Sequence, residues 1–337
     1  VAEAAARLQQ ALCHALHEEH SQAVAACGDA EELCRDAGYL EGEAQALWLT
    51  AEVRAADSKL EEAIDAARAR LAIAERLEDS RLQVRATTLL VGFLVAAGHF
   101  EEAERAVGGA QLLAQDANDV RLQLDVLLLL VRLHLQRASH AIDTSAKAQL
   151  AKAAKAAGDA VQTATGLGEK GPRGMALYWK AQVLLSDGRY QDAQRMASDA
   201  EALFRHIQSD QGQGACLHLS GALHAVFGQA DRALDTFERA LAFAQAAKDG
   251  NLEYEVSMSI HNVSRQLQPQ QQQAAAARAQ LMMPVADAGA ASEAGAVSMA
   301  PAQPKGLDPG WVRKQLMTFV RDVIANEEEM EVDSPFM

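Results

Sequence analysis

A glycine-rich stretch is the first feature of this sequence that could do chemistry. Gly166, Gly168 and Gly171 satisfy the pattern G-x-G-x-x-G. Phosphate binding by this pattern needs a strand before it and a helix N-terminus after it, so that backbone N–H groups point at the phosphates. Here a helical pattern precedes the glycines, and no parallel-strand pattern occurs in the chain. The sequence therefore favours a loop between helices over a nucleotide site.

A second cluster near the N-terminus has metal-binding residue types. His14, His17 and His20 lie close to Cys13, and the pairs His14/His17 and Cys13/His17 have the spacing of one helix face. Such pairs could supply two ligands, whereas a structural zinc site takes four. No second cluster is placed to complete the site, so we expect no metal.

Catalytic arrangements are not indicated. No Ser/His/Asp set or pair of catalytic carboxylates can be read from spacing. The acids at 61, 62, 101 and 102 fall in the first turns of predicted helices, where the helix dipole favours them. We expect no enzyme activity and no cofactor; an enzyme would need a charged pocket with strongly shifted pKa values.

Composition points to helices and away from nucleic acid. The 337 residues are 49% hydrophobic but only 4% aromatic, and this small-residue composition suits a helical solenoid. The net charge of −15 argues against nucleic acid. It is compatible with a basic peptide partner, although acidic surfaces are more often simply soluble. The apolar run from 126 to 131 is too short to span a membrane.

The cysteines indicate a reducing compartment. Cys27 and Cys34 are seven residues apart on one predicted helix, a rise of roughly 10 Å that a disulfide cannot bridge. The chain begins with Val1, so an upstream piece or a cleaved targeting peptide is conceivable. We therefore expect a soluble protein with buried thiols, in a compartment that the sequence does not name.

A repeat of about 40 residues organises most of the chain. Its marker is an alanine shortly after a turn, and these alanines lie 40 residues apart in two pairs, 63 with 103 and 193 with 233, with a further match at 23. The gap from Ala103 to Ala193 is 90 residues, ten more than two periods. A period near 40 in a helical chain predicts a stacked array.

Helical periodicity then predicts six helix pairs and one last helix. The expected ranges are 2–18 with 21–37, 42–55 with 59–77, 81–97 with 100–115, 119–137 with 145–164, 173–186 with 190–206, 213–226 with 230–248, and 251–267. We expect the ten extra residues in the connection through Ser139 and Asp143.

These units resemble tetratricopeptide repeats (TPRs). Small residues stand twelve before the marker alanines (Ala11, Ala51, Ala181, Gly221; Val91 is the exception) and seven after (Ala30, Ala110, Ala200, Ala240; Arg70 is the exception). The usual proline at the end of the second helix is absent, and the period exceeds the common one of about 34. The spacing of about 40 residues is similar to that of the longer repeats in kinesin-light-chain-like and regulator arrays. The resemblance implies an all-α, right-handed TPR-like α-solenoid over residues 1–267 with a capping helix at its end.

Beyond Gln268 the composition changes. Residues 268–305 are rich in Gln, Ala, Ser, Gly and Pro and read as a linker. In residues 306–337, apolar residues at three- and four-residue spacings predict an amphipathic helix, and an acidic run from Glu327 to Glu331 follows. This helix, the acidic loop and the final Asp-Ser-Pro-Phe-Met resemble the start of an acyl or peptidyl carrier domain, ending before the serine that would carry phosphopantetheine. The alternative is a terminal helix that docks on a protein through Trp311, Leu316, Phe319, Val320 and Val323.

The TPR resemblance also implies a binding face. In that family the first helix of each repeat lines a concave groove, which predicts contacts by Trp48, Glu52, Arg85, Thr88, Tyr178, Gln182, His218, Glu255, Asn262 and Arg265. The alternative for Trp48 and Tyr178 is that they are half-buried packing residues.

The sequence thus predicts a non-catalytic scaffold that holds a protein segment, a basic or extended peptide being one candidate, within a larger assembly. The alternative is the tether region of a multidomain polyketide or fatty-acid synthase-like protein with an acyl carrier domain. A chain that combines TPRs with a carrier domain resembles proteins of dinoflagellate algae. That resemblance would imply a plastid stroma; without it, we expect the cytoplasm.

Overall fold

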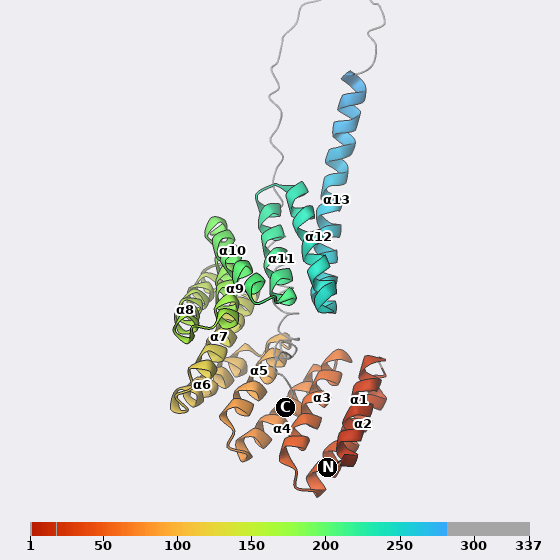
Figure 1. Cartoon of the computed structure of the whole chain (residues 1–337), viewed down its shortest axis with the longest axis vertical. Coiled ribbons are helices and arrows are strands. Elements are labelled where there is room, and N and C mark those ends of the chain that lie inside the picture. Colours follow the sequence, from red (N-terminus) through yellow and green to blue (C-terminus); the bar gives the residue numbers. More distant parts are fainter. Residues whose placement is uncertain (1, 18, 282–337) are drawn as a thin grey trace, which may run out of the picture. The chain divides into compact units, whose positions relative to one another are not determined.

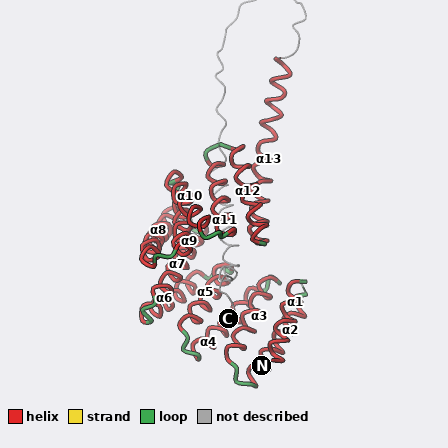
Figure 2. The backbone as a smooth tube through the Cα atoms, viewed as in Figure 1, coloured by secondary structure: helices red, strands yellow, loops and turns green. Residues whose placement is uncertain are grey.

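Short turns at regular intervals divide the chain into helices. The computed structural model describes residues 2–17 and 19–281. All of its regular structure there is helical, and none of these residues forms a strand (Figures 1 and 2). The helices are α1 (Ala2–Leu16), α2 (His20–Asp36), α3 (Leu40–Ala56), α4 (Leu60–Arg76), α5 (Ser80–Ala96), α6 (Phe100–Asp116), α7 (Val120–His140), α8 (Asp143–Leu167), α9 (Lys170–Ser186), α10 (Tyr190–His206), α11 (Asp210–Val226), α12 (Ala230–Ala247) and α13 (Gly250–Leu281).

The turns share one backbone geometry. Most of the helices end in a residue with positive φ, and after it an N–H returns to a carbonyl of the last helical turn, as in Tyr39 N to Cys34 O at 2.8 Å. The positive φ recurs every 20 residues, for example at Gly38, Ser58 and Glu78. Because this bond stops each helix after the same number of turns, it fixes half of the 40-residue period.

Turns within a repeat differ from turns between repeats. Between repeats, several first helices begin with a side-chain cap: Asp79 accepts from the N–H groups of Arg81 and Leu82, and Asp119 does the same 40 residues later. Second helices such as α4 and α6 have no such cap and instead carry two glutamates in their first turn. The sequence therefore marks the start of each kind of helix differently.

From α1 to α9 and from α10 to α13, consecutive helices pack against each other, and small residues allow their close approach. α3 packs on α4, α5 on α6 and α7 on α8, and each pair also contacts the next. The marker alanines at 23, 63, 103, 193 and 233 are all 0% exposed. Gly221 meets the same need, since a Cβ atom there would lie 2.6 Å from the Phe237 ring. The small-residue pattern predicted from the sequence is thus the packing surface between first and second helices.

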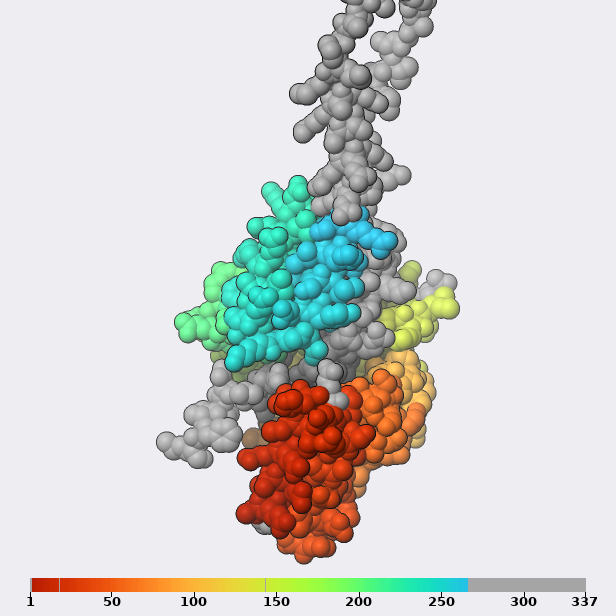
Figure 3. Space-filling model, turned by 90° about the vertical axis from the view of Figure 1, so that its right-hand side faces the viewer, coloured from red at the N-terminus to blue at the C-terminus, as the bar shows by residue number. Residues whose placement is uncertain are grey.

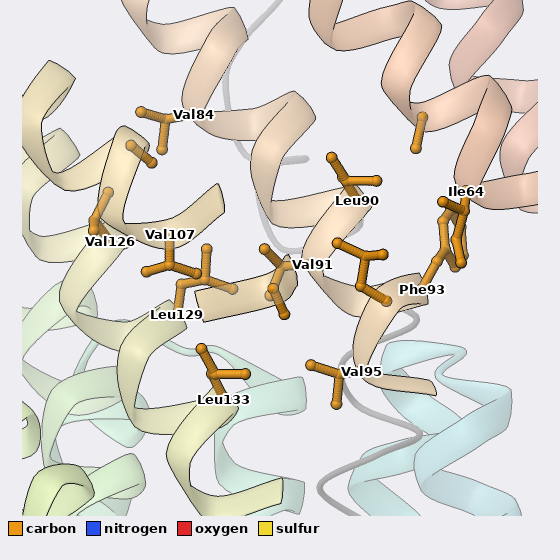
Figure 4. Close-up of a cluster of buried hydrophobic side chains, with 14 of the residues drawn as sticks. Ile64, Val84, Leu90, Val91, Phe93, Val95, Val107, Val126, Leu129 and Leu133 are labelled. Carbon is orange, nitrogen blue, oxygen red and sulfur yellow. The ribbon is translucent and has the colours of Figure 1, made fainter. Parts of the chain in front are cut away.

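Between the alanines, aliphatic side chains fill the core. Val84 and Val91 of α5, Val107 of α6, and Val126 and Leu129 of α7 belong to one buried cluster (Figure 4). Val91, the exception to the small-residue pattern, is 2% exposed. The branched side chain of Val91 buries apolar area between the first and second helices and is smaller than an aromatic ring.

The irregular fourth pair differs from the prediction. The ten extra residues do not form a long connection, because α7 has 21 residues and α8 has 25, whereas the regular helices have 17. The two helices pack against each other, and Ala138 in the added turn of α7 is 2% exposed. An Ala- and Lys-rich sequence continues a helix readily once such a contact exists, so the prediction of a loop through Ser139 and Asp143 was wrong.

The last helix also runs further than expected. α13 ends at Leu281 rather than near Leu267. Gln and Ala have high helix propensity, so this segment can continue the helix. The division into domains at residue 268 remains a prediction.

By its internal contacts the described chain forms two units, with the division after Arg189. The first contains α1 to α9 and the second α10 to α13. In the second unit α12 and the first part of α13 lie side by side (Figure 3).

Candidate functional site

The first helices carry one stripe of side chains in a constant register. Counted from the residue that precedes each first helix, the stripe consists of positions six, nine and thirteen, which share one helix face. In the first unit these are Gln45, Trp48 and Glu52 on α3; Arg85, Thr88 and Gly92 on α5; Asp125, Leu128 and Arg132 on α7; and Met175, Tyr178 and Gln182 on α9. In the second unit they are Ala215, His218 and Ala222 on α11, and Glu255, Met258 and Asn262 on α13. We call this set the first-helix stripe.

Nine of the ten residues expected to line a groove belong to the first-helix stripe; Arg265 follows Asn262 by three residues on α13. Their exposure varies. Arg85 and Arg265 are exposed, and Trp48, Glu52, Thr88 and Asn262 are partly buried. Tyr178, Gln182, His218 and Glu255 are buried, at 3%, 1%, 4% and 8% exposure.

The two aromatic residues of the stripe have different surroundings. Trp48 packs beside a cluster that contains Ala11, Ala23 and Leu49, so it is half-buried. Tyr178 is buried, and its ring lies edge-on to that of Trp179, with centroids 5.5 Å apart. Gln182 Nε2 donates a hydrogen bond of 2.9 Å to Tyr178 Oη. The tyrosine is therefore held in a fixed orientation on α9.

A buried arginine on α7 completes this part of the stripe. The Arg132 guanidinium lies 5.8 Å from the centre of the Trp179 ring, a cation–π distance. The residue is 1% exposed, and burial lowers the pKa of Arg132 to about 9. The group still carries its charge at neutral pH. The face of the indole ring stabilises this desolvated cation.

Arg132 and its neighbours on α7 were missed from the sequence. The fourth repeat was the irregular one, so no groove positions were assigned to α7. A signal was present: Asp119 stands 40 residues after Asp79, and both cap a first helix. That cap gives the register in which Asp125, Leu128 and Arg132 follow.

On the second unit the stripe contains a buried histidine. His218 Nε2 and Ser259 Oγ of α13 lie 2.9 Å apart, and the imidazole packs on Phe237 with ring centroids 5.5 Å apart. Burial lowers the pKa of His218 to about 4. An imidazole with so low a pKa is a weak base at neutral pH, so the His–Ser contact is suited to joining α11 to α13 rather than to activating a nucleophile.

The other chemical candidates fall into structural roles. Gly168 ends α8 in the left-handed conformation, while Gly166 lies within α8 and Gly171 within α9. His14 contacts Glu19, with Nδ1 and Oε2 2.6 Å apart, and His17 Nδ1 lies 2.7 Å from the Cys13 carbonyl oxygen. Over residues 2–17 and 19–281, no three metal-capable side chains gather at one point.

The cysteines are free thiols, and the expectation of buried thiols holds for three of the four. Cys13 is exposed, whereas Cys27, Cys34 and Cys216 are buried. Burial raises the pKa of the Cys27 thiol to about 11, so this group is not a nucleophile at neutral pH. Of the helices that the structure describes, none has the length and apolar character needed to cross a membrane. The terminal docking residues Trp311, Leu316, Phe319, Val320 and Val323 lie outside the described residues.

Comparisons with known proteins support the fold. No protein-family model matches the sequence, and no curated protein matches it. Among solved structures, the apo form of RapI aligns with a TM-score of 0.54 and 12% identity, over 79% of this chain and 99% of that one. BtubC (BKLC) from P. vanneervenii aligns with a TM-score of 0.51 and 20% identity, over 72% and 98% of the two chains.

A third similar structure contains tetratricopeptide repeats by its own description. It is a Signal Transduction ATPase with Numerous Domains from Pyrococcus horikoshii with a tetratricopeptide repeat sensor, at a TM-score of 0.52 and 14% identity. The alignment covers 77% of this chain but only 38% of that one. At these identities the likeness concerns the fold alone. It confirms an all-α, TPR-like solenoid of consecutive helix pairs.

Proposed function

We infer that this chain is a non-catalytic scaffold that binds a segment of another protein along the first-helix stripe of its first unit, as one subunit of a larger assembly. The observation that carries the inference is the composition of the stripe in the first unit. Its register repeats from helix to helix, yet its residues change from Trp48 to Thr88 to Tyr178. Packing positions keep one residue type, as the marker alanines do, whereas a recognition surface varies along its length.

The chemistry of the stripe supports recognition rather than reaction. It combines aromatic rings, the exposed guanidinium group of Arg85, hydroxyl groups and amide groups, all carried by helices. Helices keep their backbone N–H groups for internal bonds, so they offer few donors for a developing oxyanion. Side chains carried on packed helices also lose little backbone entropy when a partner binds.

A photo-crosslinking experiment tests this function. A photoreactive amino acid replaces Arg85, which is exposed on first helix α5, or Arg105, which is exposed on second helix α6, in otherwise identical chains. Both proteins are irradiated in an extract of the native source, and the products are identified by mass spectrometry. We expect one stoichiometric partner protein to be crosslinked at position 85 and none at position 105.

The matched charge reversals Arg85→Glu and Arg105→Glu sharpen the result. Arg85→Glu should weaken capture of the crosslinked partner at least tenfold, while Arg105→Glu leaves it unchanged. Equal capture through both positions, or capture through position 105 alone, would contradict a binding face on the first helices.

The sequence after Lys305 favours one alternative, the tether region of a carrier-bearing synthase-like protein. The residues that resemble a carrier domain lie outside the described residues, so the encoding gene is the direct test. A Gly-x-Asp-Ser-Leu just after Met337 would support the tether. A stop codon at that point would leave the scaffold alone.

A further inference from the structure

The last helix of the second unit is a first helix that no second helix follows within the described residues. α13 begins at Gly250, 40 residues after the start of α11 at Asp210, and it packs on α12 and α11 (Figure 1). In the pairs before it, a short turn leads from the first helix to the second, whereas α13 continues to Leu281. In the described part of the chain, a seventh pair therefore lacks its second helix.

In a complete pair, the second helix covers one face of the first. On α11 a Cβ atom at Gly214 would lie 3.3 Å from Phe243 Cβ, and one at Gly221 would lie 2.6 Å from the Phe237 ring, both on α12. The positions that share this face at intervals of three and four residues are all buried on α11: Gly214, Leu217, His218, Gly221 and Ala225. The same five positions of α9 are buried as well.

On α13 this face is exposed. Forty residues after the buried set of α11 stand five exposed residues: Tyr254, Ser257, Met258, His261 and Arg265. Tyr254 is 63% exposed and Met258 39%. We call these five residues the α13 face. Its first half is apolar and aromatic and its second half is polar, so it fits a helix whose apolar residues include a large ring.

The chain contains a segment with the spacing of a second helix. The second helices of the second unit each bury four residues at intervals of four, three and four: Ala193, Ala197, Ala200 and Phe204 on α10, and Ala233, Phe237, Ala240 and Ala244 on α12. Val312, Leu316, Phe319 and Val323 have the same intervals, after Asp308 and Pro309 as a helix start. An isolated helix of this length is marginal in water and is stabilised when its apolar side is buried.

We propose that residues 309–324, the tail segment, bind the α13 face antiparallel to α13 and act as the second helix of a seventh pair. In the register of α11 and α12, Leu316 takes the place of Phe237 and lies between Met258 and His261. Phe319 then takes the place of Ala240 and lies against Tyr254. This inference concerns the second unit and is independent of the proposed function, which concerns the first.

The charges at the end of the tail segment agree with this register. A second helix ends beside the start of its first helix, so the acidic run from Glu327 to Glu331 would come to the N-terminus of α13. That helix end carries a partial positive charge, which favours carboxylates. Lys248, in the turn directly before α13, is exposed there. The opposite direction of the tail segment would bring the same carboxylates to the other end of the α13 face, away from both.

The connecting chain is long enough for this arrangement. Along α13, 16 residues separate Arg265 from Leu281, a rise of about 24 Å. The 27 residues from 282 to 308 have a root-mean-square span of about 26–31 Å if they behave as a flexible chain. Such a linker holds the tail segment near the α13 face at an effective concentration on the order of millimolar, so a weak contact is enough to keep the face occupied.

Crosslinking in the full chain tests both the contact and its direction. A photoreactive amino acid replaces Tyr254 or His261, and an equal mixture of ¹⁴N- and ¹⁵N-labelled protein is irradiated. We expect crosslinks within one chain, from position 254 to residues 319–324 and from position 261 to residues 312–316. The control position is Asp235, which is exposed on α12, and it should give at least tenfold fewer crosslinks to the tail segment.

Two matched double variants test the apolar side of the tail segment. Phe319→Asp with Val323→Asp should lower the crosslinks at position 254 at least tenfold and speed hydrogen exchange of the α13 amides between 250 and 265 at least threefold. Met317→Asp with Thr318→Asp adds the same two carboxylates on the other side of the expected helix and should change neither quantity.

Four results would overturn the proposal. They are crosslinks only between labelled and unlabelled chains, which would assign the α13 face to a second copy; the reversed order of crosslinks from positions 254 and 261; equal losses in the two double variants; and no crosslinks to the tail segment. None of them bears on partner capture at position 85, so failure here leaves the proposed function standing, and failure of capture there leaves the seventh pair standing.

Discussion

The first and second helices of the repeats solve different packing problems. A second helix such as α10 buries one narrow stripe, made of Ala193, Ala197, Ala200 and Phe204, and leaves the rest to water. A first helix such as α9 buries residues on nearly every side, from Gly174 to Leu185. Within each unit, first helices pack on the neighbouring second helices, and several also pack on one another, as α5 does on α7. Second helices such as α4 and α6 meet through an exposed ion pair. The same period in the sequence thus holds an outer layer with one buried face and an inner layer with several.

The largest effect should come from filling the junction of the two layers. Ala63 of α4 is 0% exposed and belongs to the same cluster as Ala51 of α3, whereas Ala69 on the same helix is exposed. Ala63→Leu should lower the free energy of unfolding by about 3 kcal/mol, because three added heavy atoms must displace a neighbouring helix. Ala69→Leu, with the same change of side chain, should stay within about 0.5 kcal/mol.

Urea unfolding followed by circular dichroism measures both variants. Similar losses for the two would show that the packing between first and second helices is loose enough to absorb a leucine. The alanine pattern would then reflect composition rather than contact.

The contrast between the layers explains what the sequence could predict. The outer layer has one buried stripe, so its alanines at 63, 103, 193 and 233 keep their 40-residue spacing, and the helix pairs follow from them. The first helices of the inner layer are buried on several sides, so no single stripe of buried residues stands out in their sequence. Tyr178 and Trp48 occupy the same register, yet one is buried and the other half-buried, because their neighbours differ and a periodic pattern contains no information about neighbours.

The irregular pair shows the same limit from another direction. The excess of ten residues was evident from the spacing of Ala103 and Ala193, but its place was not. Whether extra residues lengthen a loop or two helices depends on a partner for the added turns, and α7 and α8 supply one to each other through contacts such as His134 Nδ1 to Gln149 Oε1 at 3.0 Å. Because this pair departs from the 40-residue period, no groove positions were assigned to α7, and Arg132 was not predicted.

A pH titration separates the inner layer from the outer one. His218 of α11 is buried, and burial lowers its pKa from 6.5 to about 4. Between these values the unfolded chain binds a proton that the folded chain refuses, so stability is complete above pH 6.5 and falls as the pH drops towards 4. The loss from this one group should be on the order of 3 kcal/mol over that range and should not grow below it.

The variant His218→Gln keeps a side chain that can bond Ser259 but cannot titrate. The free energy of unfolding, measured by urea at pH 7 and pH 4.5, should fall less for the variant than for the unaltered chain. Burial also lowers the pKa of His134, so some pH dependence remains in the variant. An equal loss in both proteins would mean that water reaches His218 and that the inner layer opens around it.

The smallest effect should come from the outer surface, where ion pairs join successive second helices. Arg68 of α4 and Glu102 of α6 lie 2.7 Å apart, with 43% and 35% of their side chains exposed. The hydrogen bond to Arg68 lowers the pKa of Glu102, and that to Glu102 raises the pKa of Arg68. Exposed pairs of this kind contribute little, since water and salt screen both charges. Arg68→Ala, Glu102→Ala and the double variant should therefore melt within a degree or two of the unaltered chain, and their coupling should vanish in high salt. A large coupling that survives salt would reverse the comparison, because the spacing of the repeats would then be set by ion pairs on the outer surface as well as by the alanine contacts beneath them.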